Sequence, residues 1–238
     1  MSWLVLPRKP EPEVMNDETE AEAYALAAAQ EYLDALDETL VEQAMTLLTR
    51  GHARPSRLLD VGCGPGGIAL KLARRAPNLQ VTGVDRSAAM ILRARRAAEA
   101  QGLSGQTSFL KADGTHLCFP DASFDLVISN SVLHHLADPV QMLREMARVA
   151  RPYGIILARD LRRPSRPLFP LHIWWHGRYY SGLMRKLYRD SVHAAYTVRE
   201  LNNLLTRAGL DTARVFTHRR THLGFVRGPL VPSGPGAL

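Results

Sequence analysis

The chain is poor in cysteine and has no long apolar run. Its 238 residues include two cysteines, Cys63 and Cys118, which form no C-x-x-C pair. This argues against a disulfide framework and makes a reducing cytoplasm the expected compartment. No stretch of 18 apolar residues occurs, so we expect no transmembrane helix. The apolar residues 3–6 are too short for a signal sequence.

Further absences concern metals and nucleic acid. The chain has no internal repeat and no H-E-x-x-H motif. His172 and His176 have the i, i+4 spacing of metal ligands, but no third ligand accompanies them, so we expect no metal. No recognisable RNA-binding module is present.

The charge is unevenly distributed. The net charge is −8 over residues 1–50, +4 over 51–150 and +11 over 151–238, which sums to the formal +7. The basic end could meet an anionic substrate, a membrane surface or RNA. It could equally be an Arg-rich surface that pairs with the acidic N-terminal helices. At 46% hydrophobic residues, the composition is ample for the core of one domain, with or without an added cap.

The most informative segment is residues 58–67, LLDVGCGPGG. It predicts an apolar strand that ends near Asp60, a glycine turn, and then a helix. Glycine lets the backbone approach a ligand closely, and the free N–H groups of a new helix point at whatever lies on the turn. Gly62, Gly64 and Gly67 fit the dinucleotide pattern G-x-G-x-x-G, whereas Gly62, Gly64 and Gly66 fit G-x-G-x-G. The turn alone therefore leaves the cofactor open.

The next strands end in acids. Residues 79–84 form a second apolar strand followed by Asp85, about 20 residues after the turn, where a carboxylate can accept hydrogen bonds from both hydroxyls of a ribose. Residues 107–111 predict a third strand that leads to Asp113, which could accept a hydrogen bond from an adenine amino group.

The sequence FPDASFDLVISN followed by VLHHLADP completes a recognisable order of motifs. Over residues 57–160 the chain resembles the class I S-adenosylmethionine (SAM)-dependent methyltransferases, and most closely the branch with small-molecule and quinone methylases. The resemblance implies SAM as cofactor and S-adenosylhomocysteine (SAH) as product. It also assigns the turn to the methionine portion, Asp85 to ribose, and the segments around Arg86 and Asp113 to adenine. The implied cofactor-binding residues are Asp60, Gly62, Cys63, Gly64, Gly66, Asp85, Arg86, Met90, Ala112, Asp113, Gly114, Asn130 and Ser131.

The predicted architecture is α/β: a doubly wound, mostly parallel seven-stranded sheet of the Rossmann-like methyltransferase type. We expect a flexible segment over 1–16, one methyltransferase domain over 17–227 and a disordered tail over 228–238. Within the domain, residues 17–50 predict two helices, and Ser87 and Asp138 begin later helices. Runs at 212–217 and 221–226 predict an antiparallel edge hairpin, as the family implies.

Residues 161–196 form an insertion after the fifth strand, which in this family commonly covers the acceptor. Its aromatic and basic side chains either wall an acceptor pocket or pack the insertion on the core. The acceptor-binding candidates here and at the preceding strand end are Arg159, Asp160, Arg162, Trp174, Trp175, His193 and Tyr196.

The expected reaction is methyl transfer to a small-molecule acceptor by in-line displacement, which requires positioning and exclusion of water. A base is needed only for a protonated acceptor, and His134 or His135 could supply it or could be structural. The Pro-Pro signature of enzymes that methylate exocyclic amines is absent, because residues 129–132 read SNSV; a nucleic-acid partner is therefore not expected. An RNA methyltransferase, or a non-catalytic protein that binds SAM or NAD, remains as an alternative. The Arg-rich insertion could touch a membrane surface, and the oligomeric state is open.

Overall fold

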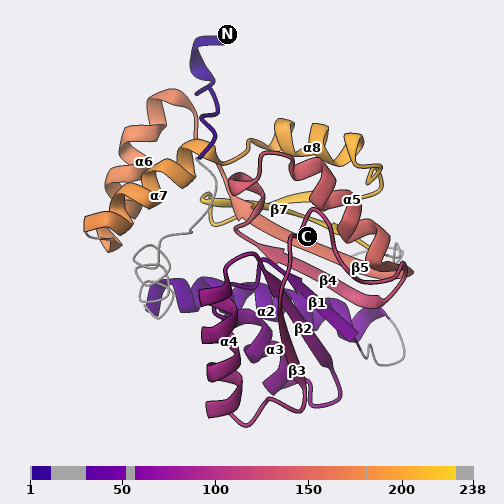
Figure 1. Ribbon diagram of the computed structural model, residues 1–238. Helices are drawn as coiled ribbons and strands as arrows, with labels where there is room; N and C mark the ends of the chain where they lie inside the picture. The colour runs from indigo at the N-terminus through magenta and orange to yellow at the C-terminus, as the bar shows by residue number, and fades with distance from the viewer. Residues whose placement is uncertain (1, 12–30, 52–56, 181, 229–238) are drawn as a thin grey trace.

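The computed structural model describes residues 2–11, 31–51, 57–180 and 182–228. Their strands form one seven-stranded sheet in the order β3-β2-β1-β4-β5-β7-β6 (Figure 1). The first five strands are parallel, whereas β7 pairs antiparallel with β5 and with β6. The strands are β1 (Arg57–Val61), β2 (Gln80–Asp85), β3 (Thr107–Lys111), β4 (Phe124–Asn130), β5 (Ala150–Leu161), β6 (Arg214–His218) and β7 (His222–Arg227). This confirms the predicted fold class.

Helices cover both faces of the sheet. Side chains alternate between the two faces along each strand, and the apolar ones on both faces must be covered. Leu58 and Leu157 join the apolar cluster with α2, α3 and α4, while their neighbours Leu59 and Ile156 join the cluster with α5 and α8. The helices are α2 (Glu31–Gly51), α3 (Gly67–Arg75), α4 (Ala88–Ala100), α5 (Pro139–Val149), α6 (Phe169–His176), α7 (Gly182–Ala194) and α8 (Val198–Arg207). Short 3-10 turns are η1 (Ser2–Leu4), η2 (Leu133–His135), η3 (Arg166–Leu168) and η4 (Gly177–Tyr179).

Local capping sets the helix starts near the carboxyl ends of the strands. Ser87 caps α4 by accepting a hydrogen bond from the backbone of Met90, and Asp138 caps α5 by accepting one from Gln141. Both starts were predicted. Of the two helices predicted over residues 17–50, the structure describes α2; residues 17–30 lie outside the described ranges.

The N-terminal residues 2–11 pack against both ends of the insertion that follows β5 and against η2 (Figure 1). The predicted flexibility of residues 1–16 stays a prediction. Arg8 donates to the carbonyl oxygens of Ala194 at 2.6 Å and of His134 at 3.0 Å, and Arg163 donates to the carbonyl of Leu6 at 2.9 Å. These bonds cross more than 100 residues of chain, so no local pattern predicts them. Residues 12–16 and 229–238 lie outside the described ranges.

Candidate cofactor pocket and adjoining histidines

A cavity lies at the carboxyl ends of β1, β2 and β4, where the strand order changes direction. Ligands in open α/β sheets bind at such a switch point. The cavity is open on one side, and its volume is about 930 Å³ when the solvent space at the mouth is included. It is lined by Val61, Gly62, Gly64, Val84, Asp85, Arg86, Ser87, Met90, Ala112, Gly114, Asn130, Ser131, Val132, His135, Leu136 and Met142.

The glycine turn forms the floor of this cavity. Gly62, Gly64 and Gly66 all have positive φ, between 53° and 85°, which side-chain-bearing residues rarely adopt. A Cβ at Gly62 would also come within 2.3 Å of the Val132 side chain. Gly66 caps α3 and lies behind the floor rather than in the lining. The turn therefore requires glycine for its shape as well as for access to a ligand.

Cys63 is buried on the side of the turn that faces α2 and α3. Burial, foremost, and the nearby carboxylates raise the pKa of its thiol, so the thiol stays protonated. Cys63 is therefore a packing residue of the turn and not a nucleophile.

Asp85 ties the glycine turn to the start of α4. Its Oδ2 accepts a hydrogen bond from the backbone N–H of Gly64 at 3.0 Å, and its Oδ1 accepts one from Ser87 at 2.8 Å. Burial raises the pKa of Asp85, against the lowering effect of these two bonds. A carboxylate has about four lone-pair positions, so two remain for the hydroxyls of a ribose.

Two more acids lie behind the turn. Asp60 is 2% exposed, and burial together with the charges of Asp37 and Asp85 raises its pKa to about 8. Asp37, from α2, accepts a hydrogen bond from Asn130 at 3.3 Å, and burial raises its pKa to about 6. Both line a second cavity between α2, α3 and the turn, which shares Gly62, Gly64 and Asn130 with the first. No motif marks Asp37, and the sequence analysis missed it.

The segment after β3 is only partly in the lining. Ala112 and Gly114 line the cavity, as do Arg86 and Met90. Asp113 does not: its Oδ1 accepts hydrogen bonds from the backbone and hydroxyl of Thr115, at 2.9 and 2.7 Å. Its predicted bond to adenine therefore remains a prediction.

The end of β4 presents a strained residue to the pocket. Ser131 has φ 58°, in the left-handed region, and its N–H donates to the carbonyl of Arg159 at 2.8 Å. Such strain persists where the surroundings enforce it and is common at binding sites. Ser131 and Asn130 both line the cavity, and their predicted place beside the methionine portion stays a prediction.

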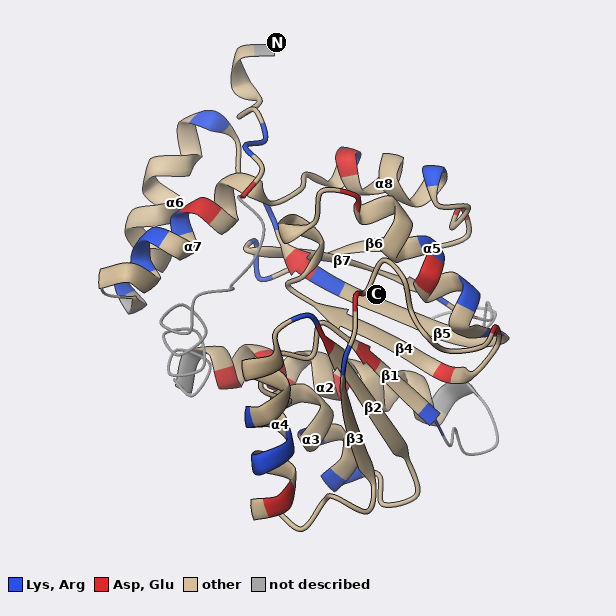
Figure 2. Cartoon of the chain, viewed as in Figure 1, with Lys and Arg blue, Asp and Glu red and all other residues tan. Residues whose placement is uncertain are grey.

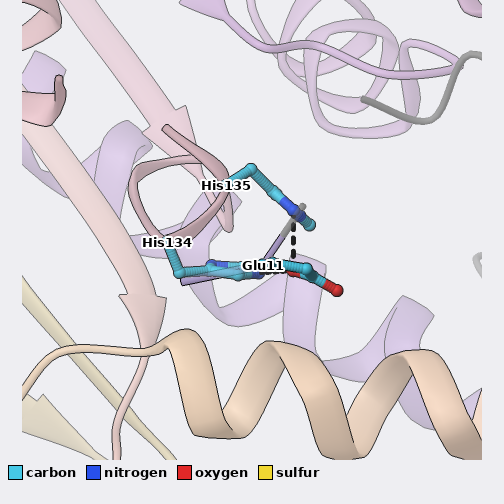
Figure 3. A group of neighbouring side chains, drawn as sticks. All are labelled: Glu11, His134 and His135. Atoms are coloured by element: carbon cyan, nitrogen blue, oxygen red, sulfur yellow. Dashed lines mark ion pairs between the residues drawn. The ribbon is translucent and has the colours of Figure 1, made fainter. Parts of the chain in front are cut away.

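The two histidines of η2 have different surroundings (Figure 3). His135 lines the cavity, and its Nδ1 lies 2.9 Å from a carboxylate oxygen of Glu11. His134 is buried, with its Nδ1 2.5 Å from Asp160 Oδ1 and its backbone N–H on Asp160 Oδ2. The structure thus brings only His135 to the pocket. It also adds Glu11, which the sequence analysis missed because it lies 124 residues away.

Charge distinguishes the two rings. Burial opposes protonation of His134, but Asp160 and then Glu11 outweigh it and raise the pKa of His134. Burial, and then the charge of His134, lower the pKa of His135, against the raising effect of Glu11. Burial opposes ionisation of Glu11, but the two histidines lower its pKa overall. The surroundings therefore favour the ionised form of Glu11, the charged form of His134 beside Asp160, and the neutral form of His135.

Glu11, His134 and His135 place one possible ligand atom each within 4.8 Å of one another, which is the composition of a two-histidine, one-carboxylate metal site (Figure 3). In this structure, however, Nδ1 of His134 lies against Asp160 and Nδ1 of His135 lies against Glu11. The hydrogen-bond network accounts for the cluster.

None of the seven predicted acceptor-binding residues is in the cavity lining: Arg159, Asp160, Arg162, Trp174, Trp175, His193 and Tyr196. Arg159 is buried against α2, where it donates to the carbonyl of Leu36 at 3.0 Å and to Thr39 Oγ1 at 2.8 Å. Asp160 holds His134, and Tyr196 is buried beneath the Arg8 guanidinium. Each of these three is already engaged inside the protein, so its predicted contact with the acceptor stays a prediction.

The other four lie in or beside the insertion. Arg162 pairs by a β-bridge with Tyr196, and the His193 ring packs edge-on against Phe169. Trp174 and Trp175 are exposed on α6. The insertion is helical, as predicted, and α7 contacts η2.

A glycine turn, an acid at the end of the neighbouring strand and a cavity at the switch point define a Rossmann-like protein that binds a nucleoside cofactor. Comparison with known proteins specifies the family. A family model described as "Methyltransferase domain" matches residues 59–158. The chain is 30% identical over 198 residues to malonyl-[acyl-carrier protein] O-methyltransferase of Geobacter sulfurreducens, covering 80% of this chain and 68% of that protein. The chain belongs to the class I SAM-dependent methyltransferases.

Other similarities agree with this family. Over 117 residues the chain is 39% identical to demethylmenaquinone methyltransferase of Thermus thermophilus, covering 49% of this chain and 52% of that protein. The chain spans about half the length of the first curated relatives it matches. The crystal structure of the plantazolicin methyltransferase BpumL with a triazolic desmethylPZN analog and SAH has a TM-score of 0.70 at 16% identity. That match covers 88% of this chain and 90% of the other, and it supports the fold.

Proposed function

We propose that this chain transfers a methyl group from SAM to a small-molecule acceptor. The observation that carries the proposal is the position of the Asp85 carboxylate, beside a side-chain-free glycine turn at the carboxyl ends of β1 and β2. Family membership supports SAM as the cofactor.

The charges of the site fit this cofactor. SAM carries a sulfonium and an ammonium against one carboxylate, so it is a net cation. Asp85, Asp60 and Asp37 surround the glycine turn, and burial holds the pKa of each above its ordinary value. A cationic ligand would lower the pKa of these carboxyls, and it would bind their ionised forms more tightly than their protonated forms. Asp85 would accept from the ribose, and Asn130 and Ser131 would lie beside the amino-acid portion.

SAM supplies an electrophilic methyl carbon, and the remaining requirements fall on the protein. The apolar walls of the cavity, Val132, Leu136 and Met142, exclude water from the acceptor. We propose His135 as the base for a protonated acceptor. Its Nδ1–H donates to Glu11, which leaves Nε2 unprotonated and able to take the acceptor's proton as the new bond to the methyl carbon forms. Glu11 then stabilises the imidazolium, so the N-terminal segment completes the site.

The test is a screen of metabolite extract with SAM labelled at the methyl group. The expected result is label in a small molecule, lost when His135→Ala replaces the wild type and retained in a surface control such as Glu99→Gln. Label in RNA, or no transfer to any acceptor, would contradict the proposal.

The wider setting is also proposed. The two free cysteines, Cys63 and Cys118, support a reducing compartment, for which we propose the cytoplasm. Within the described ranges no helix is both long and apolar enough to cross a membrane. We further propose that residues 17–227 act as a single methyltransferase domain. A peripheral membrane contact through the Arg-rich residues 161–196 is supported by their charge.

A further inference from the structure

All three tryptophans of the chain are exposed to solvent. The exposed fraction is 66% for Trp3, 61% for Trp174 and 48% for Trp175. Tryptophan is on average a largely buried residue, because its ring removes much apolar area from water when it packs. Every tryptophan of this chain lies outside the core. This indicates that their apolar surface contacts another molecule or a membrane.

The three tryptophans lie in one region, although Trp3 is about 170 residues from the others in sequence. The turn η1, which contains Trp3, contacts η3, and η3 leads directly into α6. Figure 1 shows the N-terminal turn close to the start of α6. Leu168, Leu171 and Trp175 follow each other at three- and four-residue steps, so they lie along one side of the helix. We call this surface the tryptophan face, and its exposed residues are Trp3, Leu4, Val5, Leu168, Leu171, Trp174 and Trp175.

The insertion that carries most of the face is basic. Residues 161–189 contain seven basic side chains and no acidic one. Arg166, Arg178, Arg185, Lys186 and Arg189 are exposed among them. The Arg178 guanidinium lies 4.1 Å above the Trp175 ring, so positive charge and exposed aromatic surface meet in the face itself. Figure 2 shows basic residues along α7, beside α6. The first acid after residue 160 is Asp190, in the second half of α7.

A surface with exposed tryptophan and leucine, surrounded by arginine, is typical of proteins that bind the interface of an anionic bilayer. The aromatic rings occupy the headgroup level, and the guanidinium groups bind lipid phosphates. We propose that the tryptophan face docks on a membrane surface rich in anionic lipid. This inference rests on the membrane contact proposed above. It adds which residues enter the lipid and which lipid charge they require. The face lies on the insertion whose α7 contacts η2, the turn that carries His135.

Intrinsic fluorescence tests this directly, because every tryptophan belongs to the face. Wild-type protein is titrated with vesicles of phosphatidylcholine, with and without phosphatidylglycerol, in the absence of SAM and acceptor. The expected result is a blue shift of the emission and co-sedimentation with the anionic vesicles only, both weakened by salt. Because no methyl transfer is measured, failure here and failure of the proposed reaction are separate results.

Two double variants locate the contact. Trp174→Ser with Trp175→Ser should remove the apolar contact, and Arg185→Glu with Lys186→Glu should reverse two charges. Each is expected to weaken binding at least about tenfold. Leu92→Ser and Arg96→Glu, at exposed positions on α4, are the matched controls and should bind as the wild type does. Thermal melting checks that all variants fold.

Three outcomes would overturn the proposal. One is equal binding to neutral and anionic vesicles, and another is wild-type binding by both double variants. The third is a concentration-dependent dimer that the Trp174 and Trp175 variant abolishes while vesicles leave the emission unchanged; a second copy of the chain would then be the occupant of the face.

Discussion

The carboxylate of Asp85 accepts a hydrogen bond from the backbone N–H of Gly64 at 3.0 Å, across the gap between the ends of β2 and β1. This contact links the two motifs that the sequence analysis treated separately, the glycine turn and the acid about 20 residues beyond it. It places the carboxylate over the floor of the cavity, with lone pairs left for a ligand. One hydrogen bond therefore joins the backbone that shapes the floor to a carboxylate that charges the pocket.

Replacing the first glycine should distort the pocket. Gly62→Ala adds a Cβ within 2.3 Å of Val132 and forces an alanine to φ 75°. We expect a loss of at least about 1 kcal/mol of unfolding free energy from the backbone alone, and weaker SAM binding. Adding Val132→Ala should remove the clash but not the backbone strain, so urea unfolding should show partial recovery. Full recovery would mean that the left-handed conformation is not required.

His135→Ala should lower kcat by about 10²- to 10⁴-fold, the usual contribution of a general base, while the SAM Kd stays near the wild-type value. Glu11→Gln should have a smaller effect on the rate, but it should change the pH profile. Glu11 raises the pKa of His135, so its loss should move the acidic limb of kcat/KM to lower pH. Unchanged turnover in His135→Ala would show that this histidine is structural and is not the base.

Arg159→Met should affect stability rather than acceptor recognition. The buried guanidinium bonds to α2 and lies 3.8 Å from Asp37, so its removal leaves buried acceptors without a partner. The expected loss is about 2 kcal/mol or more in urea unfolding, whereas Arg162→Met, at a half-buried position, should change stability by about 0.5 kcal/mol or less. A fully stable Arg159→Met with a raised acceptor KM would contradict this assignment.

The pKa of Asp60 gives a signed pH dependence for the protein without ligand. The carboxyl is protonated up to about pH 8 when folded, but it ionises near pH 3.8 when unfolded. Below pH 4 the Asp60 carboxyl is protonated in both the folded and the unfolded protein, so its pKa shift does not change the free energy of unfolding. Between pH 4 and 8 the unfolded state releases the proton first, so stability falls as the pH rises. Asp60→Asn should therefore melt near wild type at pH 4 and increasingly above it toward pH 8. Asp121→Asn, at an exposed position, should show no such trend.

The sequence predicted the fold well where local patterns govern it. Alternating strands and helices, and the caps at Ser87 and Asp138, follow from side-chain periodicity and short-range hydrogen bonds. The cofactor pocket followed from motifs of the same kind. Asp37 and Glu11 were missed because each reaches the site from an N-terminal segment whose position depends on tertiary packing.

The position of Arg159 also follows from a local pattern. Ile155 and Leu157 belong to the apolar cluster with α2, so alternation along β5 directs Arg159 to that side and Asp160 to the side of η2. This alternation can be read from the sequence of β5, and it places Arg159 on the face of the sheet that α2 covers.

The most direct test of the central claim is isothermal titration of the wild type and of Asp85→Ala with SAM and with NAD. We expect the wild type to bind one SAM and no NAD, and Asp85→Ala to lose SAM binding while its melting temperature shows an intact fold. Wild-type affinity for SAM in Asp85→Ala, or binding of NAD in place of SAM, would contradict the account.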